Sequence, residues 1–436
     1  MQQQYHEHIK QKCSVYRAAM KLVACDYLLI AAGRTQYRFR DDVNLPFAVN
    51  AYFSEFVPLA QPDCYLLLSS ESDMPTLLLK SESDYWHSAP PALGTVYRSA
   101  LEVIEYSESR QLQKLLPATE RMAFIGVSED FGVLAQSGQL NPIILLNYVD
   151  YYRAWKTTYE IDNLRVANQL AVGAHIEAER LYRQGCSEYD IHLGYLAKLQ
   201  YQDADLPYQS VVARNENAGV LHHMILGRTS GAQYSMLIDA GAQSNGYAAD
   251  ITRTYVGEQG SELFGYLVSE MDALQQQLIS NIKPGLSYVT LHQMAHQLIA
   301  QLLCDSGIVR VSAEQCVDSG LSSTFFPHGV GHLIGVQVHD KGGQLCDAEG
   351  GVCPPPAAHP FLRCTRTLAA GMTVTVEPGL YFIPMLLEQW RGRDDLIDSK
   401  AINELLPHGG IRVEDGMLLL SDGVENFTRN AFCKGN

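Results

Sequence analysis

Short apolar runs alternate with polar and helix-like segments over residues 1–155. Turn residues bound each run, which is the pattern of a buried strand. The runs occupy residues 28–30, 65–68, 77–79 and 124–126. The turn-forming stretch 71–75 separates the second run from the third and predicts a hairpin between them. Residue types that bind metals do not cluster in this half, so we expect a scaffold or lid and not a catalytic body.

The pattern changes at about residue 156, after which apolar residues recur at spacings of three and four. They are Leu164, Ala167, Ala171, Ala174, Ala178 and Leu181. This spacing predicts a long amphipathic helix that ends at Gly185. A chain of 436 residues is long for one hydrophobic core, so we expect two domains, at 1–155 and 156–436. Because no Gly/Ser-rich linker separates them, we expect the two domains to be packed and not loosely tethered.

A short motif recurs in the second domain at an offset of 100 residues. Gly185-x-Ser187 appears again as Gly285-x-Ser287. In each copy the glycine follows a helical stretch, and the serine is placed to cap the next helix. The repetition indicates that the domain is built from two similar halves.

Composition excludes several classes of protein. The net charge of −16 argues against a nucleic-acid partner, which would require a basic surface. Ten cysteines are scattered without a Cys-x-x-Cys pair, so neither a disulfide framework nor a zinc ribbon is expected. The first residues lack the apolar core of a signal peptide, and no run approaches the ~20 apolar residues of a membrane span. We therefore expect a cytoplasmic protein in a reducing compartment, without membrane attachment.

The stretch 236–255 carries the first candidate chemistry. Two β-branched runs are joined by Ser-Asn-Gly at 244–246, a strong signal for a hairpin. Asp239 and Asp250 lie at nearly equal distances from that turn, so folding brings their carboxylates almost opposite each other. Like charges in that position are destabilising unless something positive lies between them. An ion pair with Arg253 and a bound cation are the two explanations that the hairpin alone leaves open.

Later segments supply further candidate ligands. They are His328, His332 and His339 in a glycine-rich stretch, Glu377 at the end of a β-branched run, and Glu414 in another short strand. Two Asp, one His and two Glu on strands form a set of hard oxygen donors with one nitrogen. Such a set suits a pair of divalent ions such as Mn²⁺, Co²⁺ or Zn²⁺, and not a thiolate zinc site.

These four motifs, in this order, resemble those of the pita-bread metallopeptidases, and within them the bacterial Xaa-Pro dipeptidases (prolidases), the branch that includes the organophosphorus acid anhydrolases. The resemblance extends from Asp41-Asp42 and the segment 84–87 to the segment 426–429. It implies an α+β fold: a pita-bread catalytic domain of two similar halves, with a curved antiparallel sheet covered by helices. A smaller α/β domain precedes it.

The resemblance also implies the metal ligands. Asp250 and Glu414 would bridge two divalent ions, Asp239 would complete one site, and His332 with Glu377 would complete the other. The ions would hold and deprotonate a shared water that attacks the scissile carbonyl. Mn²⁺ is the expected metal, with Co²⁺ and Zn²⁺ as alternatives.

Residues beyond the ligands are implied in the same way. His222 and His339 would contact the substrate and steady the tetrahedral intermediate, with His223 as the alternative to His222. His328 would be a structural donor near the site. Arg412, two residues before Glu414, would balance the charge of the carboxylates.

A dipeptidase must hold a free carboxylate, which arginine does best through its bidentate fork. Alignment with prolidases favours Arg363 for this role, with Arg366 in reserve. The small apolar pockets of the family correspond here to Tyr208, Tyr288, Val338 and Leu362. In the family a neighbouring subunit closes the pocket, which at the matching positions implies Asp42, Trp86 and a homodimer.

We therefore expect an enzyme that hydrolyses Xaa-Pro dipeptides, with phosphotriester hydrolysis as a promiscuous side activity. Aminopeptidase P, which acts on longer Xaa-Pro peptides, is the nearest alternative within the fold. A non-catalytic pita-bread domain that binds peptides is an alternative from another class; loss of ligands would mark it, and none is lost here.

Overall fold

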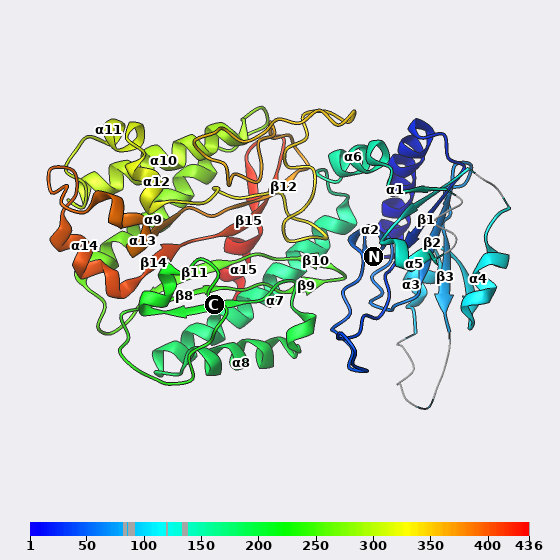
Figure 1. The fold of residues 1–436 in the computed structure, drawn as a ribbon, viewed down its shortest axis with the longest axis horizontal. Coiled ribbons are helices and arrows are strands. Elements are labelled where there is room, and N and C mark those ends of the chain that lie inside the picture. Colours follow the sequence, from blue (N-terminus) through cyan, green and yellow to red (C-terminus); the bar gives the residue numbers. More distant parts are fainter. Residues whose placement is uncertain (82–84, 86–91, 119–120, 133–137, 436) are drawn as a thin grey trace. The chain divides into compact units, whose positions relative to one another are not determined.

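The computed structural model describes residues 1–81, 85, 92–118, 121–132 and 138–435. The chain forms two compact units, each with its own sheets (Figure 1). The first comprises Met1–Asp162 and Asp347–Gly351, and the second comprises Asn163–Cys346 and Val352–Asn436. The first unit therefore runs a few residues past the expected boundary at 155 and includes a short segment from the second half of the chain.

A six-stranded sheet in the order β4-β3-β2-β1-β5-β6 forms the centre of the first unit. Its strands are β1 (Tyr27–Ala31), β2 (Tyr65–Ser69), β3 (Thr76–Lys80), β4 (Glu102–Tyr106), β5 (Met122–Ile125) and β6 (Gln139–Leu140). Its helices are α1 (Gln2–Leu22), α2 (Ala51–Ser54), α3 (Thr95–Arg98), α4 (Ser109–Leu115), α5 (Ser128–Phe131) and α6 (Ile143–Tyr152). The four predicted apolar runs are all strands, and β2 and β3 form the predicted antiparallel hairpin.

Long helices in the second unit lie on both sides of its strands (Figure 1). They are α7 (Thr158–Arg183), whose first five residues belong to the first unit, α8 (Glu188–Leu199), α9 (Glu262–Ser280) and α10 (Tyr288–Asp305). Shorter ones are α11 (Ala313–Asp318), α12 (Leu321–Phe325), α13 (Pro384–Leu387), α14 (Ser399–Leu405) and α15 (Phe427–Gly435). The predicted long helix is α7.

The repeated glycine-serine motif connects α7 to α8 and α9 to α10. Gly185 and Gly285 have φ of 82° and 93°, a conformation that glycine adopts without a steric penalty. Ser187 accepts a hydrogen bond from the backbone of Asp190 and caps α8, as predicted. The side chain of Ser287 makes no such bond at the start of α10, so the predicted cap is wrong in the second copy.

Two three-stranded sheets and a two-stranded ribbon carry the centre of the second unit, in the orders β11-β8-β7, β12-β15-β16 and β13-β14. Their strands are β7 (Val211–Arg214), β8 (Ser235–Asp239), β11 (Thr252–Val256), β12 (Thr373–Val376), β13 (Gly379–Tyr381), β14 (Gly410–Arg412), β15 (Asp415–Leu419) and β16 (Val424–Asn426). Isolated bridges from Thr252 to Glu414 and from Leu333 to Val374 join these pieces. The bridges bring segments far apart in the sequence to one place.

The predicted hairpin turn is present. β9 (Gln243–Ser244) pairs with β10 (Tyr247–Ala248), and Asn245 and Gly246 between them have φ of 49° and 86°. Positive φ at both central residues is the type I′ geometry, whose twist matches that of the flanking strands.

One pair of cysteines, Cys346 and Cys353, forms a disulfide with Cα atoms 5.8 Å apart, although the ten cysteines form no disulfide framework. A bridge between Leu345 and Val352, together with the bond from Cys353 N to Gln344 O, folds this loop back on itself. The spacing of the cysteines in the sequence does not predict that the loop folds back in this way. Eight further cysteines carry free thiols.

Among the helices that the structure describes, none combines the length and apolar character needed to cross a membrane.

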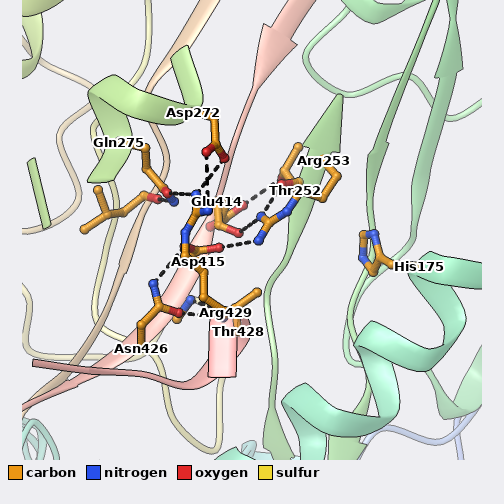
Figure 2. Close-up of polar contacts among 12 residues, drawn as sticks. His175, Thr252, Arg253, Asp272, Gln275, Glu414, Asp415, Asn426, Thr428 and Arg429 are labelled. Atoms are coloured by element: carbon orange, nitrogen blue, oxygen red, sulfur yellow. Dashed lines mark hydrogen bonds and ion pairs between the residues drawn. The ribbon is translucent and has the colours of Figure 1, made fainter. Parts of the chain in front are cut away.

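A buried ionic network supports the strand that follows Glu414 (Figure 2). Asp415 is fully buried, and its carboxylate forms ion pairs with Arg253 at 2.7 Å and with Arg429 at 2.8 Å. Arg429 also donates to Asp272 at 2.7 Å and to Gln275 at 2.6 Å. Burial alone would raise the pKa of Asp415, but the two guanidinium groups hold that pKa below its ordinary value. The network ties β15 to β11, α9 and α15.

The substitution Asp415→Asn should lower the free energy of unfolding of the protein by about 3–5 kcal/mol, because it leaves two guanidinium groups without their buried partner. Urea-induced unfolding followed by circular dichroism measures the loss. Asp395→Asn is the matched control, since Asp395 pairs with Arg393 on the surface and its loss should change stability little. Similar losses in the two variants would contradict the role given to the network.

Candidate metal centre

The hairpin brings two carboxylates together. Asp239 is the last residue of β8, and Asp250 lies two residues before β11. The hydroxyl of Tyr208 lies 2.8 Å from Oδ1 of Asp239 and 2.6 Å from Oδ1 of Asp250. One hydroxyl proton can serve only one of these oxygens. The other oxygen therefore requires a further proton or a cation.

His332 enters from a segment that lies beside β12. Its backbone carbonyl accepts a hydrogen bond from Thr375 N at 2.9 Å, and its Nδ1 lies 2.9 Å from the carbonyl of Leu333. If Nδ1 carries the proton, the lone pair of Nε2 faces Asp250 Oδ2 at 3.4 Å and Glu377 Oε1 at 3.8 Å. A metal-ligating histidine almost always donates its other ring N–H in this way.

Glu414 completes the group from the two-residue connection between β14 and β15. Its backbone N–H bonds Thr252 O at 3.0 Å, and Thr252 Oγ1 donates to its Oε2 at 2.9 Å. Its Oε1 is buried without a hydrogen-bond partner among the described residues and lies 3.9 Å from His332 Nε2. A buried carboxylate oxygen without a partner is costly unless a cation binds it.

Positive charge near the carboxylates is limited. Arg412 is buried and donates to Asp239 Oδ2 at 2.7 Å, which is the balancing position expected for it. Arg253 points to Asp415 and to the carbonyl of Glu414, so it does not neutralise the hairpin carboxylates. Of the two explanations left open by the hairpin sequence, the ion pair with Arg253 is therefore excluded.

The protonation of the group reflects this imbalance. Burial raises the pKa of Glu377 to about 7 and raises that of Glu414 well above its ordinary value. Burial also raises the pKa of Asp239, although Arg412 opposes the rise. Asp250 is the exception: burial favours its neutral form, but the hydrogen bond and charge of His332 keep its pKa low. Without a cation, this group therefore retains protons at neutral pH.

The donor set fits two divalent cations. The ligand atoms of Asp239, Asp250 and Glu414 lie within 4.8 Å of one another, as do those of His332, Glu377 and Glu414. Four carboxylates and one imidazole are donors suited to Mn²⁺, Co²⁺ or Zn²⁺. We call these five residues the carboxylate centre.

The other histidines take distinct positions. The ring of His339 lies 4.6 Å from that of His332, centroid to centroid. His222 is exposed, whereas His223 lies with its Nε2 2.9 Å from Glu188 Oε2. The choice of His222 over His223 is therefore consistent with the local contacts, because the ring of His223 is already engaged.

Glu188 organises the segment that carries His222, a role that the sequence did not reveal. Its carboxylate accepts bonds from Arg214 N at 2.7 Å, Asn217 Nδ2 at 2.9 Å and Gly227 N at 2.6 Å. Burial would raise its pKa, but these donors and His223 lower it to about 2. The only indication of this role in the sequence is that a glutamate lies in the first turn of α8.

Tyr381 is a second residue that the sequence analysis missed. Arg412 Nη1 donates to its hydroxyl at 2.8 Å, and the hydroxyl lies 2.9 Å from His328 Nε2. Burial, with the nearby charge of Arg412, lowers the pKa of His328 to about 3, so this histidine is neutral. These contacts hold the guanidinium group of Arg412 in the position from which it donates to Asp239.

The candidate substrate residues differ in exposure. Arg363 is exposed, whereas Arg366 is buried and donates to the carbonyl of Gly342 at 3.3 Å. Tyr288 is fully buried and donates its hydroxyl proton to Thr375 O at 2.6 Å, so it packs in the core against β12.

Leu362 is buried, and Val338 is half-buried. Asp42 is exposed in the first unit, and Trp86 lies outside the described residues.

Comparison with known proteins places these observations in a family. Residues 162–420 match the model of metallopeptidase family M24, and residues 3–151 match that of the Xaa-Pro dipeptidase N-terminal domain. The chain is 40% identical over 408 residues to a Xaa-Pro dipeptidase of Shewanella loihica, with 92% of each chain covered. It is 41% identical over 443 residues to one of Proteus mirabilis, with 98% of each covered.

Solved structures show the same fold. Zn-substituted E. coli aminopeptidase P in complex with product superposes with a TM-score of 0.73 at 22% identity, covering 97% of this chain and 95% of that one. Proline aminopeptidase P II from Yersinia pestis gives 0.72 at 21% identity, covering 97% and 96%. The fold is thus the α+β pita-bread architecture with a preceding N-terminal domain, as expected. The chain belongs to metallopeptidase family M24 and, within it, to the Xaa-Pro dipeptidases.

Proposed function

We propose that this protein hydrolyses dipeptides with a C-terminal proline, using two divalent ions held by the carboxylate centre. The observation that carries the proposal is the complete donor set around the unpartnered Oε1 of Glu414. The relatives of similar length named Xaa-Pro dipeptidase support the choice of substrate.

Within the centre, Asp250 and Glu414 are the proposed bridging ligands. Glu414 belongs both to the group with Asp239 and Asp250 and to the group with His332 and Glu377, which supports this assignment. Two ions bound there would lower the pKa of a shared water and polarise the scissile carbonyl. The oxygen-rich set favours Mn²⁺, with Co²⁺ and Zn²⁺ as alternatives.

The remaining residues would position the substrate. His339, whose ring lies beside that of His332, and His222, on the segment held by Glu188, would hydrogen-bond the reacting group. Arg412 orients Asp239 through their 2.7 Å contact and opposes the rise in its pKa that burial causes. Tyr208 holds the two hairpin carboxylates at a fixed separation.

Arg363 is the proposed partner of the substrate carboxylate. Its exposure leaves it accessible to a ligand, whereas the buried Arg366 already bonds a backbone carbonyl. A guanidinium fork that pairs with a free carboxylate favours dipeptides over the longer peptides taken by an aminopeptidase P. Tyr208, Val338 and Leu362 would line the proline pocket, with Tyr288 supporting it from below.

The family resemblance supports two further proposals. The protein would act as a cytoplasmic homodimer in which Asp42 and Trp86 of one subunit close the pocket of the other. Sedimentation of the purified protein tests the dimer, and a monomer at assay concentration would exclude it. Hydrolysis of phosphotriesters would be a side activity of the same centre.

The substitution Glu414→Gln should deplete bound metal and lower kcat for Leu-Pro by several orders of magnitude, because it removes the charge shared by both ions. Elemental analysis and the dipeptide assay measure the two effects. Glu404→Gln is the matched control, since Glu404 is exposed on α14 and should leave both unchanged. Full metal occupancy with near-normal turnover in Glu414→Gln would overturn the dinuclear assignment.

Chelation should make stability depend on pH. The folded-state pKa of Glu377 is raised to about 7, so its contribution is present below the ordinary pKa of 4.5 and is lost as pH rises through 7. A shift of this size corresponds to about 3 kcal/mol. The raised pKa values of Glu414 and His332 act in the same direction.

The melting temperature of the chelated protein should therefore fall between pH 5 and 8, and Glu377→Gln should flatten the fall. Saturating Mn²⁺ should remove most of the dependence, because the cations replace the protons. An equally steep fall in the metal-loaded protein would contradict this account.

The substitution Arg363→Ala should raise KM for Leu-Pro by an amount equivalent to about 2–5 kcal/mol, as expected for a desolvated charge pair. Hydrolysis of a neutral phosphotriester, where it is measurable, should be spared. Arg391→Ala, which alters another exposed arginine, is the control. If the wild-type enzyme cleaves Arg-Pro-Pro as well as it cleaves Leu-Pro, aminopeptidase P activity is the better description.

A further inference from the structure

Three histidines outside the carboxylate centre form a compact group. His292 and His296 lie one helical turn apart on α10, and His359 approaches them from a loop that precedes Leu362. The ring centroids of His359 lie 4.4 Å from His292 and 4.5 Å from His296, and the last two are 4.7 Å apart. We call these three residues the histidine cluster.

The polar atoms of the cluster are only partly satisfied. His292 is 1% exposed, and its Nδ1 is buried with no hydrogen-bond partner in the part of the chain that the structure describes. The Nδ1 of His296 lies 3.0 Å from Ser322 Oγ, which fixes the orientation of that ring. A buried ring nitrogen without a partner is an unusual cost in a folded core.

The three rings are in the form that binds metals. Burial lowers the pKa of His292 to about 2 and that of His296 to about 3, and it lowers the pKa of His359 as well. Neutral imidazole is the metal-binding form, so protons do not compete at neutral pH.

We propose that His292, His296 and His359 bind one zinc-class ion at a site separate from the carboxylate centre. Two histidines four residues apart on a helix place both rings on one side of an ion, and a third ring from a loop makes a three-histidine site with one open position. Because the cluster contributes only imidazole nitrogens, it selects Zn²⁺, Ni²⁺ or Cu²⁺ over Mn²⁺ and Mg²⁺.

The geometry requires only a local adjustment. One candidate nitrogen from each ring lies within 4.8 Å of the others. Around a tetrahedral ion with bonds of 2.0–2.1 Å, two nitrogens lie about 3.4 Å apart. His359 is half-buried on its loop, so its ring has room to move and bring the nitrogens to the shorter separation.

The ion would join α10 to the turn that leads to Leu362. His359 begins this turn, because its carbonyl accepts a bond from Leu362 N at 3.2 Å. Leu362 in turn packs against Gly329, where an added Cβ would lie 3.1 Å from the Leu362 Cα. The ion would therefore fix the loop that carries Arg363, whether or not the proposed substrate is correct.

Zinc binding tests the site without measuring activity. Three full-length proteins are compared: Asp250→Asn, Asp250→Asn with His359→Gln, and Asp250→Asn with His6→Gln. The first substitution weakens the carboxylate centre, and His6 is an exposed histidine on α1 that controls for loss of any histidine. Each protein is dialysed against micromolar ZnCl₂ with excess MgCl₂, and bound zinc per chain is measured.

The Asp250→Asn protein and the double variant with His6→Gln should each retain one more Zn²⁺ per chain than the double variant with His359→Gln. Zinc should also raise their melting temperature by more, since an ion that binds only the folded state stabilises it. With Co²⁺ in place of Zn²⁺, the visible absorption of a four-coordinate site should be lost with His359→Gln. Equal zinc content and equal thermal shifts in the three proteins would overturn the proposal.

These outcomes do not depend on the proposed function. Because the proteins compared share the Asp250→Asn substitution, zinc remaining at the carboxylate centre contributes equally to each. Circular dichroism before dialysis confirms that His359→Gln is folded. A folded protein without the extra ion supports the site, and a folded protein that keeps it excludes His359 as a ligand.

Discussion

The gathering of four carboxylates in a buried site is the constraint on which the second unit depends. At an effective dielectric constant of ~20, two like charges 4 Å apart repel by about 4 kcal/mol, which exceeds the net contribution of a typical hydrogen bond. Of these four carboxylates, only that of Asp239 accepts a hydrogen bond from the guanidinium group of Arg412. The segments that carry the other carboxylates must therefore be secured by contacts elsewhere. The buried ionic network around Asp415, one residue beyond Glu414, is the clearest of these contacts.

Local features of this arrangement can be predicted from sequence because they depend on nearby residues. Asn245 and Gly246 specify a type I′ turn, and that turn sets the distance between Asp239 and Asp250. The partner of Arg253 could not be predicted in this way. Its guanidinium bonds Asp415, 162 positions further along the chain, because a bridge from Thr252 to Glu414 sets that register.

Choices between neighbouring residues of one type also needed the structure. His222 and His223 are adjacent in sequence, but His222 is exposed whereas His223 is half-buried and contacts Glu188. Arg363 and Arg366 differ in burial, which follows from how their loop packs and not from its composition. The residue types that bind metal ions can be recognised in the sequence. Which of two neighbouring residues is free to act depends on partners that lie far away in the chain.

Residues that meet at the carboxylate centre are far apart in the sequence, and this separation affects the order in which the protein folds. Thr252 and Glu414 are 162 positions apart, and Arg412 and Asp239 are 173 apart. At roughly 5–20 residues per second of synthesis, the hairpin leaves the ribosome about 10–30 s before its partners do. Throughout that interval Asp239 and Asp250 lack Arg412 and Glu414, and His332 and Glu377 are synthesised only part of the way through it. Cation binding, which contributes folding free energy only where the ligands are assembled, can therefore stabilise the chain only at a late stage of its folding.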